Sequence, residues 1–198
     1  MIKILPVYSE LEPIVCLSAA ISPQDIAEIV RIGDNQEFQN AKVGSNQDGV
    51  ENDRVRDSKI TWLHHTEQTD WLFNKMAEIT STVNSDKYQF ELSHIDAFQY
   101  TTYTENGFYG WHVDADFKKT FGPNQRKLGF SLILNEQGVD FEGGDFQVNF
   151  SEERLPVNVN MNKGHVLLLP SFLLHRVTPV TKGIRKTLVC WVIGPKFR

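Results

Sequence analysis

The hydrophobic and polar positions follow one pattern before residue 88 and another pattern after it. In the first part, two segments have the spacing of amphipathic helices. Ser22, Pro23 and Asp25 have the order typical of a helix start, and the apolar spacing that follows them ends at Gly33. A second helix is predicted over 69–83. Its apolar positions follow at spacings of four, three and four residues: Leu72, Met76, Ile79 and Val83.

After residue 88, short apolar segments alternate with turns, as they do in β proteins. Eight strands are predicted, over 90–103, 109–115, 127–134, 144–150, 157–160, 165–170, 172–177 and 184–193. The breaks at 142–145 and 181–183 contain glycine and have the length of hairpin turns. This pattern predicts a mainly β (α+β) fold with two sheets, which the helices support rather than forming a second core.

We expect the chain to be organised as one domain. Residues 88–198 would form its β core, and residues 1–87 would form a helical and strand support that is part of the same domain. Residues 34–53 are polar and rich in glycine and asparagine, which predicts a loop. That loop either closes over a substrate or is simply solvated.

Composition and charge narrow the class of protein. The chain has 198 residues and a formal net charge of −5, so a broad basic surface for nucleic acid is not expected. No segment approaches the ~20 apolar residues of a membrane-spanning helix. Cys190 lies in an apolar run, so we expect a free thiol rather than a disulfide framework. These observations predict a soluble cytoplasmic protein without membrane partners.

Among six histidines, His112 has a carboxylate at a useful spacing. On an extended strand, residues two apart point to the same side, so His112 and Asp114 can converge on one point. An imidazole and a carboxylate are two of the three ligands in the facial triad of non-haem Fe(II) sites. Four other histidines are treated as structural or left without a role: His64, His65, His94 and His165.

The C-terminal segment offers the third ligand and a basic residue. His175 lies on a predicted strand, and a hairpin after it would bring Arg185 back beside it. The arginine side chain presents a rigid fork of donors that matches a carboxylate. Thr187, two residues further, would point to the same side and add a hydroxyl group. A metal site with an arginine nearby suits a dicarboxylate that chelates the metal with one end.

With these residues in view, the sequence resembles the 2-oxoglutarate and Fe(II)-dependent dioxygenases, and in particular their prolyl 4-hydroxylase-like branch. The spacing of His112-x-Asp114, His175 and Arg185 carries the resemblance. Further motifs of that branch are Tyr103 nine residues before the first histidine, the stretches 108–110 and 143–146, and the upstream segment 55–63. Residues 175–185 are especially similar to the bacterial PKHD-type hydroxylases.

The resemblance implies a double-stranded β-helix of the jelly-roll or cupin-like type. It also implies a site in which three residues bind Fe(II) and serve catalysis: His112, Asp114 and His175. Arg185 would bind the distal carboxylate of 2-oxoglutarate with help from Thr187, and Tyr103 would line the same pocket. The implied reaction consumes O₂ and 2-oxoglutarate, releases succinate and CO₂, and hydroxylates a prolyl residue of a peptide or protein. Ascorbate is implied as a reductant of the iron.

Other functions are compatible with the same residues. A dioxygenase of this class could act on a small molecule or on nucleic acid, although the net charge argues against nucleic acid. A cupin-like binding protein or isomerase could hold Zn or Mn with two histidines and an acid, but it has no need of Arg185. A sensor or scaffold could retain the site without turnover. The aromatic side chains Tyr109, Trp111 and Trp191 either cover a peptide at the mouth of the site or belong to the core.

Overall fold

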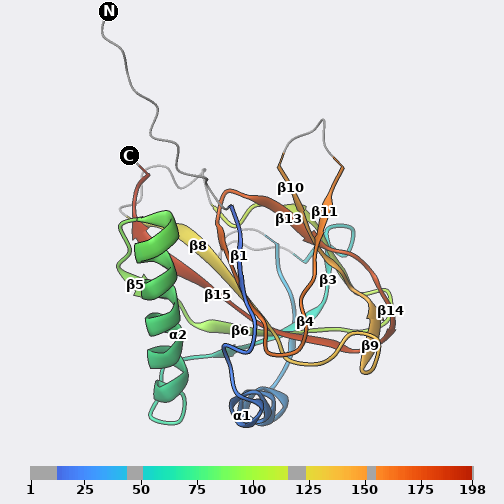
Figure 1. Cartoon of the computed structure of the whole chain (residues 1–198). Coiled ribbons are helices and arrows are strands. Elements are labelled where there is room, and N and C mark those ends of the chain that lie inside the picture. The colour runs from blue at the N-terminus through green and yellow to red at the C-terminus, as the bar shows by residue number, and fades with distance from the viewer. Residues whose placement is uncertain (1–12, 44–50, 116–123, 151–154, 198) are drawn as a thin grey trace, which may run out of the picture.

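Two antiparallel sheets form the body of the protein, seen in the computed structural model of Figure 1. The structure describes residues 13–43, 51–115, 124–150 and 155–197. The large sheet has the strand order β1 (Val15–Leu17), β12 (Val166–Pro170), β8 (Asn124–Ile133), β15 (Arg185–Pro195), β6 (Phe98–Tyr103), β4 (Lys59–Leu63) and β2 (Gln39–Asn40), with β5 (His94–Ile95) also paired to β15. The small sheet has the order β11 (Val157–Val159), β10 (Phe146–Asn149), β13 (Leu174–Val177), β7 (Phe108–His112) and β3 (Arg56–Asp57). The mainly β architecture predicted from the sequence is confirmed.

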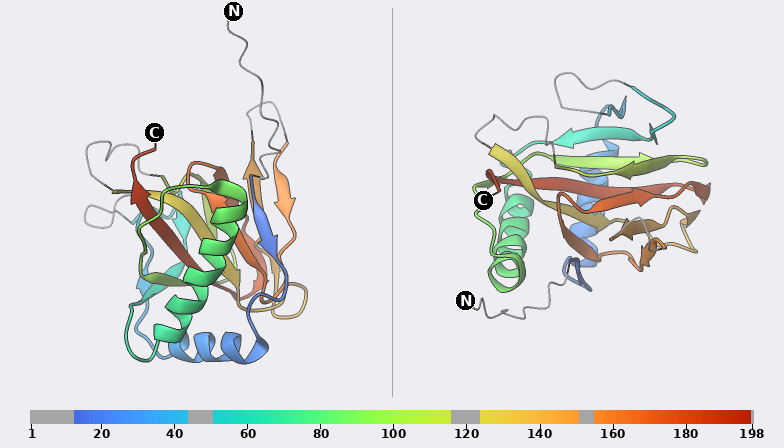
Figure 2. Two further views of the ribbon diagram at one scale, coloured as in Figure 1. Left: turned by 60° about the vertical axis from the view of Figure 1, so that its left-hand side comes forward. Right: turned by 90° about the horizontal axis from the view of Figure 1, so that it is seen from above.

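Two helices pack on the large sheet, and both lie where the sequence predicts them. Helix α1 spans Pro23–Asp34, and its Ser22 hydroxyl accepts a hydrogen bond from the Asp25 backbone N–H at 3.1 Å. Helix α2 spans Asp70–Val83 and continues into a π-helical turn over Asn84–Tyr88. An ion pair between Asp25 and Lys75 links the two helices. Figure 2 shows them from two further directions.

Strand β15 separates two hydrophobic cores because its successive side chains point to opposite faces. One set consists of Leu188, Cys190 and Val192. These side chains face the helices and pack in the same core as the buried residues of α1 and α2. The intervening set points toward the small sheet: Arg185, Thr187 and Trp191. The two β15 side chains predicted to bind the cosubstrate, Arg185 and Thr187, therefore lie on the face opposite the helices, between the two sheets.

Two predicted connections were wrong. Residues 142–145 do not close a hairpin, because β9 (Phe141–Gly143) pairs with β14 (Val180–Gly183), whereas β10 pairs with β11 and β13. Gly143 and Gly144 have φ values of 70° and 64°, and they turn the chain from one pairing to the other. The predicted hairpin between His175 and Arg185 is also wrong, because β13 belongs to the small sheet and β15 to the large sheet.

The N-terminal part of the chain contributes strands to both sheets. Strand β3 pairs with β7, and β4 pairs with β6. In the predicted loop over 34–53, residues 39–40 form β2, and residues 44–50 lie outside the described part of the chain. The division into a 1–87 support and an 88–198 core stays a prediction. In the described part of the chain, neither helix is long and apolar enough to cross a membrane.

Candidate metal centre and anion pocket

Three side chains converge between the sheets in an arrangement that can hold a metal ion. His112 at the end of β7 lies directly opposite His175 of β13, and Asp114 follows β7 by two residues. His112 Nε2 is 3.8 Å from Asp114 Oδ1, and His175 Nε2 is 3.7 Å from Asp114 Oδ2. One ligand atom from each residue lies within 4.8 Å of the other two. The structure thus brings together the three residues predicted to bind iron.

The backbone fixes the orientation of both imidazole rings. Nδ1 of His112 lies 2.8 Å from the Gly110 carbonyl, and Nδ1 of His175 lies 2.8 Å from the Leu173 carbonyl. Because a carbonyl oxygen only accepts, Nδ1 carries the proton and donates in each ring. Each Nε2 is then left with a lone pair that faces Asp114, as a metal ligand requires.

The protonation states also suit a metal. Burial and the neighbouring His175 lower the pKa of His112 to about 3, so its ring is neutral at physiological pH. Burial by itself opposes ionisation of Asp114, but the fields of His175, His112 and Arg126 outweigh it and hold the Asp114 pKa below its ordinary value. Two histidines and one carboxylate form the donor set of a non-haem Fe(II) site, which leaves coordination positions open. The residues present therefore fit Fe(II).

An aromatic ring stacks on each of the two histidines. The Tyr109 ring stacks on His112 with centroids 3.5 Å apart and planes at 13°, and Phe146 stacks on His175 at 5.4 Å. The guanidinium of Arg56 lies 4.5 Å from the centre of the Tyr109 ring. Burial raises the pKa of Tyr109 to about 12, against the opposing field of Arg56, so this ring stays uncharged.

Arg56 is a buried residue of this region that the sequence analysis missed. It donates to Ser58 Oγ and to Gln99 Oε1, both at 2.8 Å, and it is 6% exposed. The segment 55–63 belongs to the resemblance, but nothing in its pattern shows that Arg56 turns inward. That orientation depends on the pairing of Arg56 with Tyr109 across β3 and β7.

Arg185 forms a second part of the site, at the start of β15. Its side chain is 2% exposed, and burial lowers its pKa while Tyr103 and Asp145 oppose that shift. The guanidinium carbon is 5.4 Å from the Tyr103 ring centre, and Nε has no hydrogen-bond partner among the described residues. A buried cation without a carboxylate partner is costly unless a ligand supplies the anion. This pocket is therefore suited to a carboxylate.

The other two residues predicted for the cosubstrate lie beside Arg185. Tyr103 is its direct partner on β6, and Thr187 lies two residues along β15 on the same face. In the described part of the chain, the Thr187 hydroxyl also has no partner. Gly144 gives the arginine its space, because a β-carbon there would lie 2.8 Å from Arg185 Cδ. The pocket thus offers an unpaired hydroxyl and an unpaired guanidinium N–H to a ligand.

The two tryptophans considered for the mouth of the site, and the four histidines that received no role, lie outside the triad and the Arg185 pocket. Trp191 lies on the inner face of β15, with the guanidinium of Arg126 3.7 Å from its ring centre. Trp111 does not cover the triad but contacts Arg176 at 4.6 Å. The unassigned histidines have partners elsewhere: His65 contacts Asp70, His94 contacts Ser93, His165 contacts Cys16, and the His64 carbonyl accepts from Thr69.

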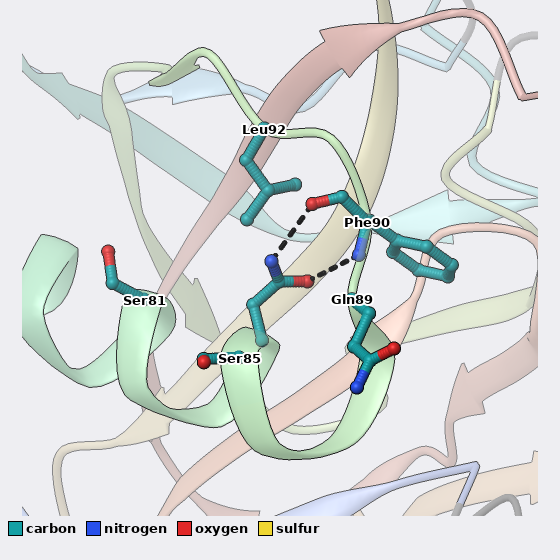
Figure 3. Close-up of a pocket in the computed structure, with 6 residues that line it drawn as sticks. Ser81, Ser85, Gln89, Phe90 and Leu92 are labelled. Carbon is teal, nitrogen blue, oxygen red and sulfur yellow. Dashed lines mark hydrogen bonds between the residues drawn. The ribbon is translucent and has the colours of Figure 1, made fainter.

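A separate surface hollow lies at the end of α2 (Figure 3). Six residues line it: Ser81, Asn84, Ser85, Gln89, Phe90 and Leu92. None of their side chains is titratable near neutral pH. The Asn84 side chain is already bonded to the backbone of Phe90, donating to its carbonyl and accepting from its N–H. This hollow lacks the chemistry of the triad, and we assign it no role.

Comparison with known proteins agrees with this geometry. Residues 98–193 match the family model described as the 2OG-Fe(II) oxygenase superfamily. A PKHD-type hydroxylase from Synechococcus sp. strain CC9902 is 40% identical over 88 residues, which cover 42% of this chain and 35% of the relative. The PKHD-type hydroxylase YbiX of Shigella boydii is 27% identical over 185 residues, covering 89% of this chain and 76% of the relative. The resemblance stated from the sequence is confirmed.

The length of these matches differs among relatives. For the first three, all PKHD-type hydroxylases, the chain spans 35%, 41% and 37% of the relative's own length.

Similar solved structures extend the likeness to the whole fold. A Pseudomonas putida prolyl-4-hydroxylase has a TM-score of 0.71 at 18% identity, covering 93% of this chain and 94% of the other. A Trichoplax adhaerens prolyl hydroxylase, solved with a hypoxia inducible factor peptide fragment, has a TM-score of 0.73 at 17% identity, covering 92% and 84%.

Proposed function

We propose that this chain, whose residues 98–193 match the 2OG-Fe(II) oxygenase family model, hydroxylates a prolyl residue of a peptide or protein. The reaction would use Fe(II), 2-oxoglutarate and O₂, with succinate and CO₂ as coproducts. One observation carries this proposal. The His112, Asp114 and His175 triad lies between the same two sheets as the buried guanidinium of Arg185. Arg185 Nε has no hydrogen-bond partner among the described residues.

The residues of the site would divide the work. His112, Asp114 and His175 would hold Fe(II), which supplies O₂ activation coupled to decarboxylation of 2-oxoglutarate. Arg185 would bind the distal carboxylate of the cosubstrate, assisted by the Thr187 hydroxyl, while Tyr103 lines the pocket. The Gly110 and Leu173 carbonyls would keep both histidine rings in the ligating tautomer.

The apolar surroundings would keep water from this chemistry. A buried cluster lies between the sheets beside the site, and it includes Val148, Leu167 and Leu169. In such surroundings the attraction between Arg185 and a carboxylate is stronger than in water. The cosubstrate would thus be held by one charge pair and chelated at its other end.

A prolyl target is supported by similarity and not by any single residue of this chain. The solved neighbours include a prolyl-4-hydroxylase and a prolyl hydroxylase with a bound peptide fragment. Ascorbate would act as a reductant of oxidised iron. The free thiols of Cys16 and Cys190 are in keeping with a cytoplasmic setting.

An anaerobic experiment tests the class of reaction. Fe(II) and then 2-oxoglutarate are added, and the weak visible charge-transfer band of a keto-acid chelated to iron is sought. The band should form, and admitting O₂ should remove it with formation of succinate. Tight metal binding without a band would contradict the proposal and favour a cupin-like protein, which Zn and Mn would then test. Mass spectrometry of proline peptides after turnover would show a 16 Da gain on proline, or exclude that target.

A further inference from the structure

Arg126 presents an arginine side chain with unused donors beside the metal centre. It lies on β8 opposite Ile193 of β15, and its guanidinium carbon is 3.7 Å from the Trp191 ring centre. Within the described ranges, the Arg126 side chain makes no hydrogen bond or ion pair. An arginine stacked on an indole keeps its N–H groups directed outward at the edge of the guanidinium plane.

Arg126 is also close to the reacting centre. Trp191, on which it stacks, pairs with Gly129, and a β-carbon on Gly129 would touch the Asp114 carboxylate. The charge of Arg126 contributes to lowering the pKa values of Asp114 and Tyr109. The Trp62 ring lies 6.2 Å from Trp191 and extends the aromatic surface. A ligand above these rings would lie next to the triad.

Arg56, the other arginine near the triad, differs from Arg126 because its side-chain N–H groups already donate hydrogen bonds. It donates to Ser58 and Gln99 and lies against Tyr109. It therefore adds positive charge but does not offer a pair of unbonded N–H groups to a ligand. The chain as a whole is acidic, with a net charge of −5. Arg56 and Arg126, neither of which forms an ion pair within the described residues, add positive charge near the triad of that acidic chain.

We propose that Arg126 binds a carboxylate of the substrate and so selects substrates with an acidic group close to the hydroxylated carbon. The inference rests on the proposed function and names a substrate class for it. A planar guanidinium and a carboxylate form two parallel hydrogen bonds, which is the strongest pairing available to Arg126. The carboxylate has two sources: an Asp or Glu side chain next to the target in a peptide, or the α-carboxylate of a free amino acid.

Matched pairs of probes distinguish these sources. Capped proline peptides with glutamate before or after the proline are compared with the same peptides carrying glutamine, and free L-proline is compared with prolinamide. Binding is measured anaerobically on the whole chain loaded with Fe(II) and 2-oxoglutarate. We expect the acidic member of one pair to bind at least ~10-fold more tightly, the usual scale for a charge-assisted hydrogen bond. A glutamate preference indicates a peptide substrate, and a preference for L-proline over prolinamide indicates a free amino acid.

The variants R126M and R126K connect any preference to this residue. R126M should abolish it, and R126K should weaken it because a lysine lacks the planar fork. The matched control is R176M. Arg176 also lies over a tryptophan, Trp111 at 4.6 Å, but it follows the inward-facing His175 on β13, so it points to the opposite face, where it donates to Gln147. R176M should leave the preference unchanged.

Two results would overturn the inference. One is equal binding of the acidic and neutral members of every pair, including no binding of either. The other is a preference that R126M leaves intact. Substrate-independent turnover of 2-oxoglutarate by the wild-type chain is followed separately. Its absence would count against the proposed oxygenase function, whereas the binding comparison would still decide the role of Arg126.

Discussion

Gly129 and Asp114 lie so close that a β-carbon on residue 129 would be 2.7 Å from Asp114 Oδ2. Gly129 is in the middle of β8 and pairs with Trp191 of β15 and Leu169 of β12. Its backbone is outside the left-handed region, so another residue could adopt it without strain. The absence of a side chain at this position therefore leaves space for a metal ligand.

The Gly129→Ala substitution should displace the Asp114 carboxylate while the sheet remains intact. We expect the affinity for Fe(II) to fall at least ~10-fold, the usual scale for disturbing the support of a metal ligand. Anaerobic Fe(II) titration measures the change, and far-UV circular dichroism confirms the fold. Unchanged iron affinity in a folded variant would show that Asp114 is not a ligand or that it relocates freely.

The His175→Ala substitution should abolish iron binding and turnover, because β13 offers no other ligand at that position. The measurement is the iron content after anaerobic loading, together with 2-oxoglutarate decarboxylation. His94→Ala is the control, since His94 is exposed and contacts Ser93 rather than the triad. Full decarboxylation by His175→Ala would refute the ligand assignment.

The Arg185→Met substitution should raise the 2-oxoglutarate concentration required for turnover while leaving iron binding largely intact. Removing one partner of a buried charge pair typically costs 3–5 kcal/mol, which corresponds to a rise of roughly 100-fold or more. Lys186→Met is the matched control, because Lys186 is the next residue on β15 and contacts Asp34 on the helix side. Equal cosubstrate requirements in both variants would show that another residue anchors the dicarboxylate.

The ion pair between Asp25 and Lys75 should make stability depend on pH. The hydrogen bond from Lys75 is the main cause that lowers the pKa of Asp25, with Ser22 adding to it. A carboxylate with a lowered pKa stabilises the fold above its usual pKa of ~3.9, and this contribution is lost as the pH falls through the lowered value.

Asp25→Asn should therefore reduce the free energy of unfolding at pH 7 by about 0.2–1 kcal/mol, the range for a partly exposed pair. The difference from wild type should shrink as the pH is lowered from 7 to 3. Urea unfolding at both pH values measures it. A difference that is constant or grows toward low pH would contradict the assignment of the lowered pKa to this ion pair.

Strand periodicity explains which parts of the site could be predicted from the sequence. The two-residue repeat of a strand predicted that His112 and Asp114 meet, and they do, although β7 ends at His112 and Asp114 lies in the bend that follows. The same repeat placed Arg185 and Thr187 on one face of β15. The capping pattern at Ser22 likewise located α1. In these cases the signal lies within a few residues, so that no knowledge of tertiary pairing is needed.

The parts that could not be predicted depend on which strands become neighbours. A short apolar segment followed by a turn looks the same whether the chain returns to its own sheet or crosses to the other, so the hairpin between His175 and Arg185 was predicted wrongly. Arg56 enters the site through pairing of β3 with β7, and Gly129 meets Asp114 through packing across the sheets. Neither relationship leaves a local pattern in the sequence.

The alternation along β15 has a consequence for how this protein can change. Leu188, Cys190 and Val192 pack toward the helices, whereas Arg185, Thr187 and Trp191 face the proposed reaction. Substitutions in the first set can adjust thermal stability without altering ligand chemistry, and substitutions in the second can alter specificity without loosening the helices. Insertion of a single residue in this strand would exchange the two sets and damage both properties at once. Evolution and engineering are therefore free to change side chains here but not the length of the strand.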